Sequence, residues 1–289
     1  MSDKKVVLIT GCSDGGLGSA LALAFHRAGY RVIATARNLS KLTETRRIGI
    51  EELELDVLSD SSIATCAKNL EALTGGRLDI LLNNAGAGYT MPVIDINISE
   101  AKKVFDLNVW SWITVTRAFI PLLMRTPNAK VVNNISIAAY AGVPSQGAYS
   151  ASKAAANMLT ETLRLELKPF GIRVIALMTG SVKSKFYQNV RAREEEASLP
   201  KDSIYRVAPG GLKVMQDTES LLIGDSLDAD TWAVQVVGDL SKANPPHQIY
   251  RGTKAVFVRY GSLMPVGTFD NQFMKMTRMD EVERAVKRA

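Results

Sequence analysis

Short apolar segments alternate with helical patterns along much of the chain, and this alternation restricts the folds that the chain can adopt. Residues 6–10 form a β-branched run, residues 21–28 have the pattern of a helix, and residues 31–36 have the pattern of a second strand. A strand, a helix and a second strand in this order make a βαβ unit with a right-handed crossover. The pattern predicts a parallel sheet with helices on both faces.

The same alternation continues to residue 178. It predicts strands over residues 53–56, 80–83, 130–135 and 172–178, and helices over residues 59–73 and 99–124 and around Tyr149. The chain has 289 residues, of which 46% are hydrophobic, and this is enough apolar material for one large core. We therefore expect an α/β fold with a Rossmann-type, doubly wound parallel sheet in a single domain.

Beyond residue 178 the alternation stops. Residues from about 185 to 228 are polar and weakly patterned, and we interpret them as a lid over a substrate pocket, with a solvated surface excursion as the alternative. Residues from about 5 to 184 then form the cofactor-binding and catalytic core. Residues from about 229 to 289 add a helix, a last strand and an extension. The last strand is expected in the apolar stretch 255–269, together with a segment that covers the pocket or a subunit interface.

The turn between the first predicted strand and helix is rich in glycine. It reads Thr10-Gly11-Cys12-Ser13-Asp14-Gly15-Gly16-Leu17-Gly18. Glycines let the backbone approach a pyrophosphate, and the amides and dipole of the helix start favour its negative charge. A P-loop for ATP or GTP needs a lysine where Leu17 follows Gly16. The turn thus indicates a dinucleotide site that uses Gly11, Ser13, Gly16, Leu17 and Gly18, and a plain tight connection is the alternative.

The end of the second predicted strand bears on the choice between NAD and NADP. An NAD site needs an acidic side chain there for the adenosine ribose, whereas this chain has Arg37. A guanidinium can pair with a 2′-phosphate, so the sequence favours NADP(H). A solvated arginine at a helix start is the alternative. Asp56 and Val57 follow the third strand, where the carboxylate can accept a hydrogen bond from adenine or stand in an ordinary turn.

Tyr149 and Lys153 lie one helical turn apart, so a phenol and an ammonium share one face of a helix. A free phenol has a pKa of about 10, and a neighbouring cation favours the phenolate. Lys153 can therefore bring Tyr149 toward neutral pH and make it a usable acid and base. Such pairs also meet by chance on amphipathic helices.

Taken together, these residues resemble the short-chain dehydrogenase/reductase family over about residues 5–184. The family's glycine motif is matched by Thr10, Gly11, Gly16 and Gly18, its sheet-bracing motif by Asn83, Asn84, Ala85 and Gly86, and its catalytic set by Asn108, Ser136, Tyr149 and Lys153. Two departures are an extra residue between Gly11 and Gly16, and Thr179 where the family usually has proline. With the segment 250–253, both look like the fungal branch that includes 1-acyldihydroxyacetone-phosphate reductase.

The resemblance implies hydride transfer from nicotinamide to a carbonyl carbon. Tyr149 protonates the developing alkoxide, Ser136 holds the carbonyl oxygen, and Lys153 binds the nicotinamide ribose. Asn108 holds a water that links Lys153 to solvent. Alternatively, Ser136 caps a loop, and Asn108 is an asparagine with low helix propensity whose side chain bonds to the backbone. The other cofactor-binding residues that the resemblance implies are Asn84, Ala85, Gly86, Thr179, Gly180, Val182 and Ser184.

The residues expected around the substrate are largely apolar. They are the stretch 138–144 and the side chains Ile137, Tyr140, Val143, Phe186, Tyr187 and Leu212. We therefore expect a hydrophobic ketone or aldehyde as substrate. Lys183, Lys185 and Arg191 can recognise a phosphate on it, or they are surface charges. The alternatives to a reductase are a cyclase or isomerase on the same fold and a catalytically silent NADP-binding scaffold.

Several classes of function are excluded by composition. Cys12 and Cys66 make no disulfide framework and have no metal-ligand spacing with His26 or His247, so no metal is expected. The basic residues behind the net charge of +6 are dispersed, which argues against nucleic-acid binding.

The location and assembly of the protein are also expectations. The start of the sequence has no long apolar stretch, so a cytoplasmic protein is expected. The stretch 255–269 is short of the roughly 20 residues that span a bilayer. Peripheral contact with the endoplasmic reticulum or a lipid droplet is the alternative. The resemblance implies a homodimer or homotetramer formed through the two long helices from Ser99 and Tyr149.

Overall fold

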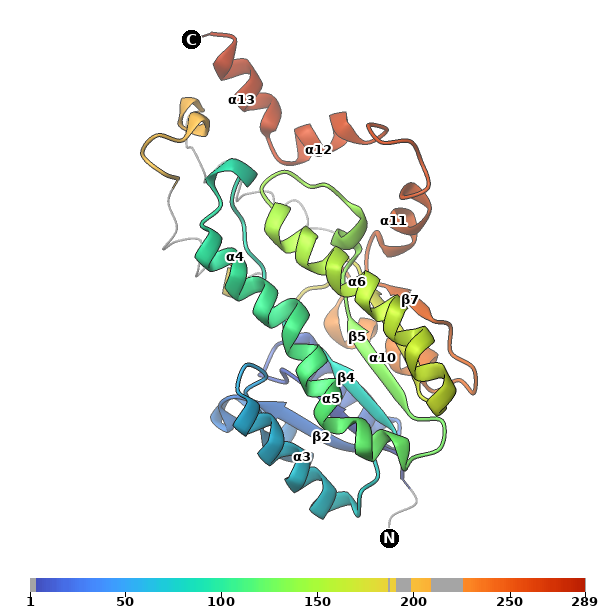
Figure 1. Cartoon of the computed structure of the whole chain (residues 1–289). Coiled ribbons are helices and arrows are strands. Elements are labelled where there is room, and N and C mark those ends of the chain that lie inside the picture. The colour runs from blue at the N-terminus through green and yellow to red at the C-terminus, as the bar shows by residue number, and fades with distance from the viewer. Residues whose placement is uncertain (1–3, 187, 191–198, 209–225, 289) are drawn as a thin grey trace.

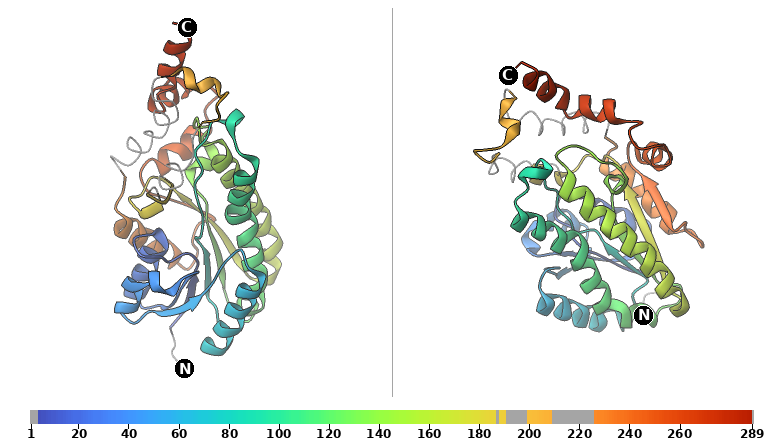
Figure 2. Two further views of the ribbon diagram at one scale, coloured as in Figure 1. Left: turned by 90° about the vertical axis from the view of Figure 1, so that its left-hand side faces the viewer. Right: turned by 45° about the horizontal axis from the view of Figure 1, so that its top comes forward.

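In the computed structural model the chain forms a seven-stranded sheet between two layers of helices (Figures 1 and 2). The structure describes residues 4–186, 188–190, 199–208 and 226–288. The strands are β1 (Val6–Ile9), β2 (Arg31–Ala36), β3 (Glu51–Glu54), β4 (Ile80–Asn83), β5 (Lys130–Asn134), β6 (Arg173–Thr179) and β7 (Gln248–Arg251). Their order is β3-β2-β1-β4-β5-β6-β7, and all neighbours are parallel. The predicted doubly wound α/β fold is confirmed.

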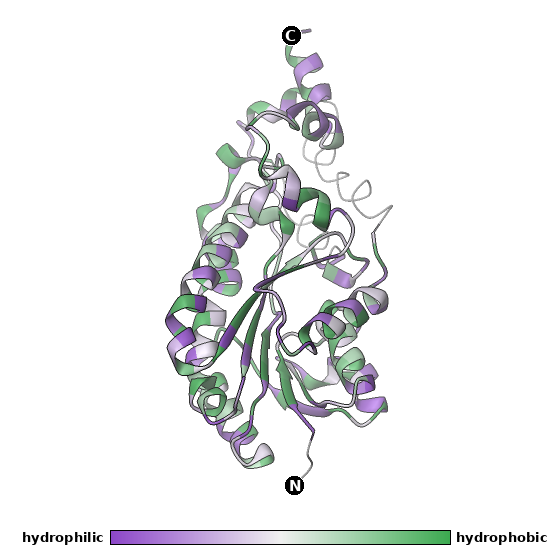
Figure 3. Cartoon of the chain, turned by 90° about the vertical axis from the view of Figure 1, so that its right-hand side faces the viewer, coloured by the Kyte–Doolittle hydropathy of each residue, from purple (hydrophilic) through white to green (hydrophobic). Residues whose placement is uncertain are grey.

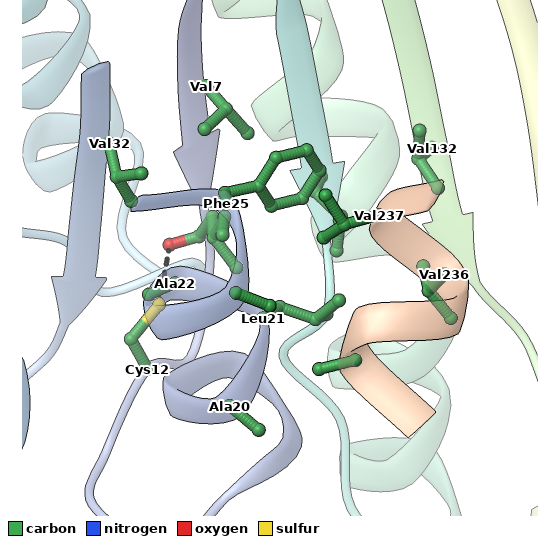
Figure 4. Packing of buried hydrophobic residues seen from close by; sticks show 14 of the residues in the cluster. Val7, Cys12, Ala20, Leu21, Ala22, Phe25, Val32, Val132, Val236 and Val237 are labelled. Atoms are coloured by element: carbon green, nitrogen blue, oxygen red, sulfur yellow. Dashed lines mark hydrogen bonds between the residues drawn. The ribbon is translucent and has the colours of Figure 1, made fainter. Parts of the chain in front are cut away.

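The helices fall on both faces of this sheet. They are α1 (Leu17–Arg27), α2 (Thr43–Arg47), α3 (Asp60–Thr74), α4 (Ile98–Phe105), α5 (Ser111–Met124), α6 (Gly147–Leu167), α10 (Ala229–Leu240), α11 (Ala255–Gly261), α12 (Asp270–Met276) and α13 (Met279–Val286). Alternate residues of β1 point to opposite faces, so Val7 packs under α1 and α10, as Figure 4 shows, and Leu8 packs under α3 and α5. Burial on both faces explains the mainly apolar strands in Figure 3.

Two predicted elements differ in detail from the observed ones. Strand β3 begins at Glu51 rather than at residue 53, because it is an edge strand and tolerates glutamates. The helix predicted over residues 99–124 consists of α4, a π-helical turn at Asp106–Trp110, and α5. The run Ile98–Met124 is long and apolar enough to cross a bilayer by length and composition alone, yet half of its most apolar window is buried in the protein.

The prediction of a last strand within residues 255–269 is wrong. The last strand is β7, which pairs with β6, and the apolar stretch begins with helix α11. Strand pairing ends because the chain turns at Gly252, where φ is +99° and a Cβ atom would lie 3.1 Å from the backbone of Gly180. Helices α11 to α13 then extend beyond the carboxyl ends of the strands (Figure 1). Much of the predicted lid, residues 191–198 and 209–225, lies outside the described residues.

A buried chain of polar side chains joins the sheet to helices α5 and α6. The amide nitrogen of Asn83 donates to the hydroxyl of Thr116 at 3.0 Å and to the amide oxygen of Asn133 at 2.8 Å. Asn133 donates in turn to the hydroxyl of Thr160 at 3.0 Å, and Thr160 donates to the carbonyl of Ala156. The sheet-bracing role that the resemblance gave to Asn83 therefore extends across β5 to α6.

We expect Thr160→Val to lower the free energy of unfolding by about 1–3 kcal/mol, because the buried amide of Asn133 then lacks an acceptor. Thr162→Val is the matched control, since that hydroxyl is on the same helix and makes an exposed bond to the carbonyl of Met158. Chemical denaturation of both variants measures the difference. Equal losses in the two variants would show that the buried bond contributes nothing of its own.

Candidate active site

The carboxyl ends of the parallel strands open into a cavity of about 1000 Å³. The predicted site residues that line it are Gly11, Ser13, Gly16, Leu17, Arg37, Asp56, Val57, Asn84, Ala85, Gly86, Ser136, Tyr149, Lys153, Thr179, Gly180, Val182 and Ser184. Asn108 and Gly18 lie beside the cavity and do not line it. The structure thus brings the predicted cofactor and catalytic residues together around one space.

Gly16 and Gly18 have different structural roles in the glycine turn. Gly16 lines the cavity and caps helix α1 without a side-chain hydrogen bond, so the first amides of α1 are left for a ligand. A Cβ atom on Gly18 would overlap the carbonyl oxygen of Gly11 and lie 2.7 Å from the amide nitrogen of Asn84. Gly18 therefore allows α1 to pack closely on the turn. The uncapped helix start, which bears no acidic residue in its first turn, fits a pyrophosphate.

The part of the cavity beyond the ends of β2 and β3 carries the side chains that the sequence relates to cofactor choice. Arg37 is exposed there beside Lys41, and within the described part of the chain its guanidinium makes no ion pair. The carboxylate of Asp56 accepts the amide of Leu58 at 3.0 Å, so it does stand in a turn, and it lines the cavity as well. Both interpretations of Asp56 are compatible with this geometry.

Tyr149 and Lys153 face the middle of the cavity from the first turns of α6. The Nζ atom of Lys153 lies 6.0 Å from the ring centroid of Tyr149 and donates to the main-chain oxygen of Asn134 at 2.9 Å. Lys153 is only 6% exposed, and this burial lowers its pKa from 10.5 to about 8. The lysine is thus still mainly an ammonium at pH 7, although its charge is poorly solvated.

Ser136 lines the cavity where β5 runs into the short 3₁₀ helix Ile137–Tyr140. Its hydroxyl oxygen accepts the amide of Ala138 at 3.1 Å, so the capping role is present. This contact uses a lone pair of the oxygen, and the hydroxyl proton can still be donated to a carbonyl oxygen. The capping contact and the predicted catalytic role are therefore compatible.

Asn108 lies in the π-helical turn between α4 and α5. Its amide oxygen accepts the N–H of Ala87 and its nitrogen donates to the carbonyl of Ala87, both at 2.9 Å, and to the hydroxyl of Ser152 at 3.0 Å. The two bonds to Ala87 agree with the alternative expected for Asn108, a side chain that bonds to the backbone. It lies close to Lys153 nevertheless, since a Cβ atom on Gly86 would be 3.1 Å from the Asn108 oxygen and 3.6 Å from the lysine nitrogen.

Thr179, where the family usually has proline, starts a chain of hydrogen bonds under the cavity. Its hydroxyl donates to the amide oxygen of Asn134 at 2.6 Å, and Asn134 donates to the amide oxygen of Asn84 at 2.9 Å. Asn84 donates to the carbonyls of Thr10 at 2.9 Å and Gly11 at 3.2 Å. The chain therefore connects the carboxyl ends of β6, β5, β4 and β1.

The part of the cavity that is predicted to hold a substrate is lined by apolar side chains. Ile137, Val143 and Phe186 line it, and the ring of Phe186 is 5.9 Å from that of Tyr149. The prediction for Tyr140 is wrong, because its hydroxyl accepts from Asn157 at 3.0 Å and its side chain does not line the cavity. Lys185 lines the cavity and Lys183 does not. Tyr187, Arg191 and Leu212 lie outside the described residues.

Helices α11 and α12 form a further wall of the cavity, of which only the part within residues 255–269 was expected from the sequence. Phe257 of α11, Phe269, and Phe273 and Met276 of α12 line the cavity, and the rings of Phe257 and Phe269 meet edge to face at 5.3 Å. The spacing of residues 269, 273 and 276 puts them on one helix face, and this pattern in the sequence indicates an apolar face that packs on other parts of the protein. This segment covers the pocket, which was one of the two roles expected for it.

Comparisons with known proteins agree with these features. Residues 5–195 match the short chain dehydrogenase family. A short-chain dehydrogenase/reductase of Pestalotiopsis microspora is 45% identical over 99% of each chain, and the NADPH-dependent 1-acyldihydroxyacetone phosphate reductase of Schizosaccharomyces pombe is 36% identical over 93% of each chain. The crystal structure of a Streptomyces avermitilis short-chain dehydrogenase matches with a TM-score of 0.75 and 27% identity over 98% of each chain. The chain belongs to the short-chain dehydrogenase/reductase family, on the branch that includes these fungal relatives.

Proposed function

We propose that the protein is an NADPH-dependent reductase of a hydrophobic ketone or aldehyde. The observation that carries this proposal is the layout of one cavity. Arg37 after β2, the glycine turn after β1, the group Ser136, Tyr149 and Lys153 near the end of β5, and aromatic side chains of α11 and α12 all line this cavity. The Schizosaccharomyces pombe relative, which is named as an NADPH-dependent 1-acyldihydroxyacetone phosphate reductase, supports both the cofactor and the substrate class.

In this proposal the bound nicotinamide supplies a hydride to the carbonyl carbon. Tyr149 donates its phenolic proton to the carbonyl oxygen as negative charge develops there. Ser136 donates a hydrogen bond to the same oxygen. Lys153 favours the phenolate that remains on Tyr149. The ammonium of Lys153 then passes a proton to this phenolate and takes one from solvent. Asn108 holds the loop of Ala87 against α6 and so positions Lys153.

The substrate we propose has a carbonyl close to a bulky or long apolar group. The aromatic wall from α11 and α12 provides the surface for that group. An acyldihydroxyacetone-phosphate-like lipid and a fungal secondary-metabolite intermediate both fit. An assay of NADPH oxidation with acyl-dihydroxyacetone phosphates, steroids, quinones and aromatic ketones tests this class. Tight NADPH binding without reduction of any of these carbonyls would favour a cyclase, an isomerase or a scaffold.

Arg37→Gln is expected to weaken NADPH binding by about 10- to 100-fold, the range for a lost charge-assisted hydrogen bond to a phosphate. Binding of NADH should change less than twofold, because NADH has no 2′-phosphate. Titration of the nicotinamide fluorescence measures both constants. Arg47→Gln, an exposed arginine that does not line the cavity, serves as the control. An equal loss for the two cofactors would contradict the assignment of Arg37.

We further propose a cytoplasmic homodimer or homotetramer. Exposed apolar side chains on the two long helices support this: Trp110 is 52% exposed, Met158 67% and Leu165 60%. Light scattering coupled to size exclusion tests the assembly. Recovery of the full chain with membranes after cell fractionation would instead support peripheral attachment.

A further inference from the structure

The extra residue of the glycine turn is accounted for by a contact with a distant segment. Gly15 does not line the cavity, and its φ of +73° disfavours any side chain. A Cβ atom there would lie 2.8 Å from the Cε atom and 3.0 Å from the Cδ atom of Lys185. The aliphatic stem of Lys185 therefore occupies the space over Gly15.

The main chain joins the same two residues. The N–H of Lys185 donates to the carbonyl of Gly15 at 2.9 Å. Lys185 follows β6 and Gly15 follows β1, and in the sheet β4 and β5 stand between those strands. The segment Ser184 to Phe186 thus reaches across the ends of β4 and β5 to the glycine turn, on the side where the cavity lies.

Charge at this place suits an anion. The ammonium of Lys185 is exposed and lines the cavity with Ser13 and Gly16. Asp14, on the same turn, is the carboxylate that would oppose an anion, and it accepts the amides of Thr43 at 2.9 Å and Glu44 at 3.0 Å. Burial raises the pKa of Asp14, but the hydrogen bond from the Thr43 hydroxyl, the two amide bonds and the charge of Lys185 outweigh burial and lower it. The carboxylate is therefore occupied by the start of α2.

We propose that Lys185 is a cofactor-binding residue whose ammonium contacts the pyrophosphate of the dinucleotide, and that Gly15 provides the room for its stem. The proposal rests on the dinucleotide site put forward above. It assigns Lys185 to the cofactor rather than to a substrate phosphate, because its stem lies on the glycine turn. The α1 amides and Lys185 then reach the pyrophosphate from two sides.

Lys185→Met tests the proposal, since methionine keeps an apolar stem and removes the charge. We expect the dissociation constants of NADPH, NADH and ADP-ribose all to rise by about 10-fold, equivalent to about 1.4 kcal/mol. Adenosine 2′-monophosphate, which carries no phosphate on its 5′ position, should bind as tightly as before. Lys185→Arg should retain most of the affinity. Lys183→Met is the control, because this exposed lysine two residues away does not line the cavity.

Isothermal titration calorimetry on the full-length protein gives these constants without any turnover. Binding of all three pyrophosphate-containing probes within twofold of the wild type would overturn the role of Lys185. A loss confined to NADPH would also overturn it, since that result places the charge at the 2′-phosphate. Failure of the wild-type protein to bind NADPH and NADH would instead count against the proposed function itself.

Discussion

Tyr149→Phe is expected to lower turnover by roughly 10²- to 10⁴-fold, the usual contribution of a general acid. The substitution removes only the phenolic oxygen and keeps the ring that faces Phe186. The dissociation constant of NADPH should therefore stay within about twofold of the wild-type value, because the glycine turn and Arg37 are unchanged. Single-turnover measurements of NADPH oxidation with a reducible ketone separate the chemical step from binding.

The matched control is Tyr260→Phe, since Tyr260 is 62% exposed and lies outside the cavity lining. This variant should turn over at the wild-type rate. Near-normal turnover of Tyr149→Phe would remove the proposed mechanism and leave the cavity as a binding site. A loss of NADPH binding that matches the loss of turnover would assign Tyr149 to cofactor binding alone.

Lys153→Met is expected to abolish reduction and at the same time to stabilise the protein without cofactor. The pKa of Lys153 is lowered from 10.5 to about 8 by burial, so the folded state carries a poorly solvated charge below pH 8. That shift corresponds to roughly 3 kcal/mol. The lost hydrogen bond to Asn134 costs about 1 kcal/mol, which leaves a net gain of about 2 kcal/mol at pH 7.

The stability difference between the wild-type protein and Lys153→Met is expected to depend on pH. A group whose pKa is lowered by folding loses its proton at a lower pH in the folded state than in the unfolded chain. The destabilising effect of the charged Lys153 on the folded state therefore decreases as the pH rises from about 8 to 10.5. The wild-type protein should therefore gain stability relative to Lys153→Met over that range. Urea unfolding of both proteins at pH 7 and pH 10 measures the difference, with Lys168→Met as an exposed control near the end of the same helix. A difference that does not change with pH would refute the buried charge.

The sequence predicts the central part of the fold because its strands are buried on both faces. Strands such as β2 (RVIATA) and β4 (ILLN) are mainly apolar, and their ends coincide with the predicted ones. Ligand-contacting side chains of such a sheet follow the carboxyl ends of the strands, so Ser136 and Thr179 could be placed from order along the chain alone. Pairing on both sides leaves a central strand little freedom of register.

Other parts of the site depend on contacts between distant segments, which no local pattern contains. The π-helical turn at Asn108 follows from bonds to Ala87 and Ser152, and a helix pattern continues through it. Gly15 and Gly16 look alike in sequence, and the approach of the distant Lys185 to Gly15 is one of the contacts that distinguish them. Tyr140 was misassigned because its partner Asn157 lies on α6.

The hydrogen-bond chain from Thr179 through Asn134 and Asn84 to Gly11 has a consequence for how this chain can diverge. Each side chain in it donates toward β1, so the orientation of every amide is set by the one before it. Proline at position 179 would remove the first donor and leave the amide oxygen of Asn134 without that partner. Substitutions at positions 179 and 134 are therefore expected to be epistatic. Related proteins with proline at position 179 should carry an apolar residue at position 134 instead of asparagine.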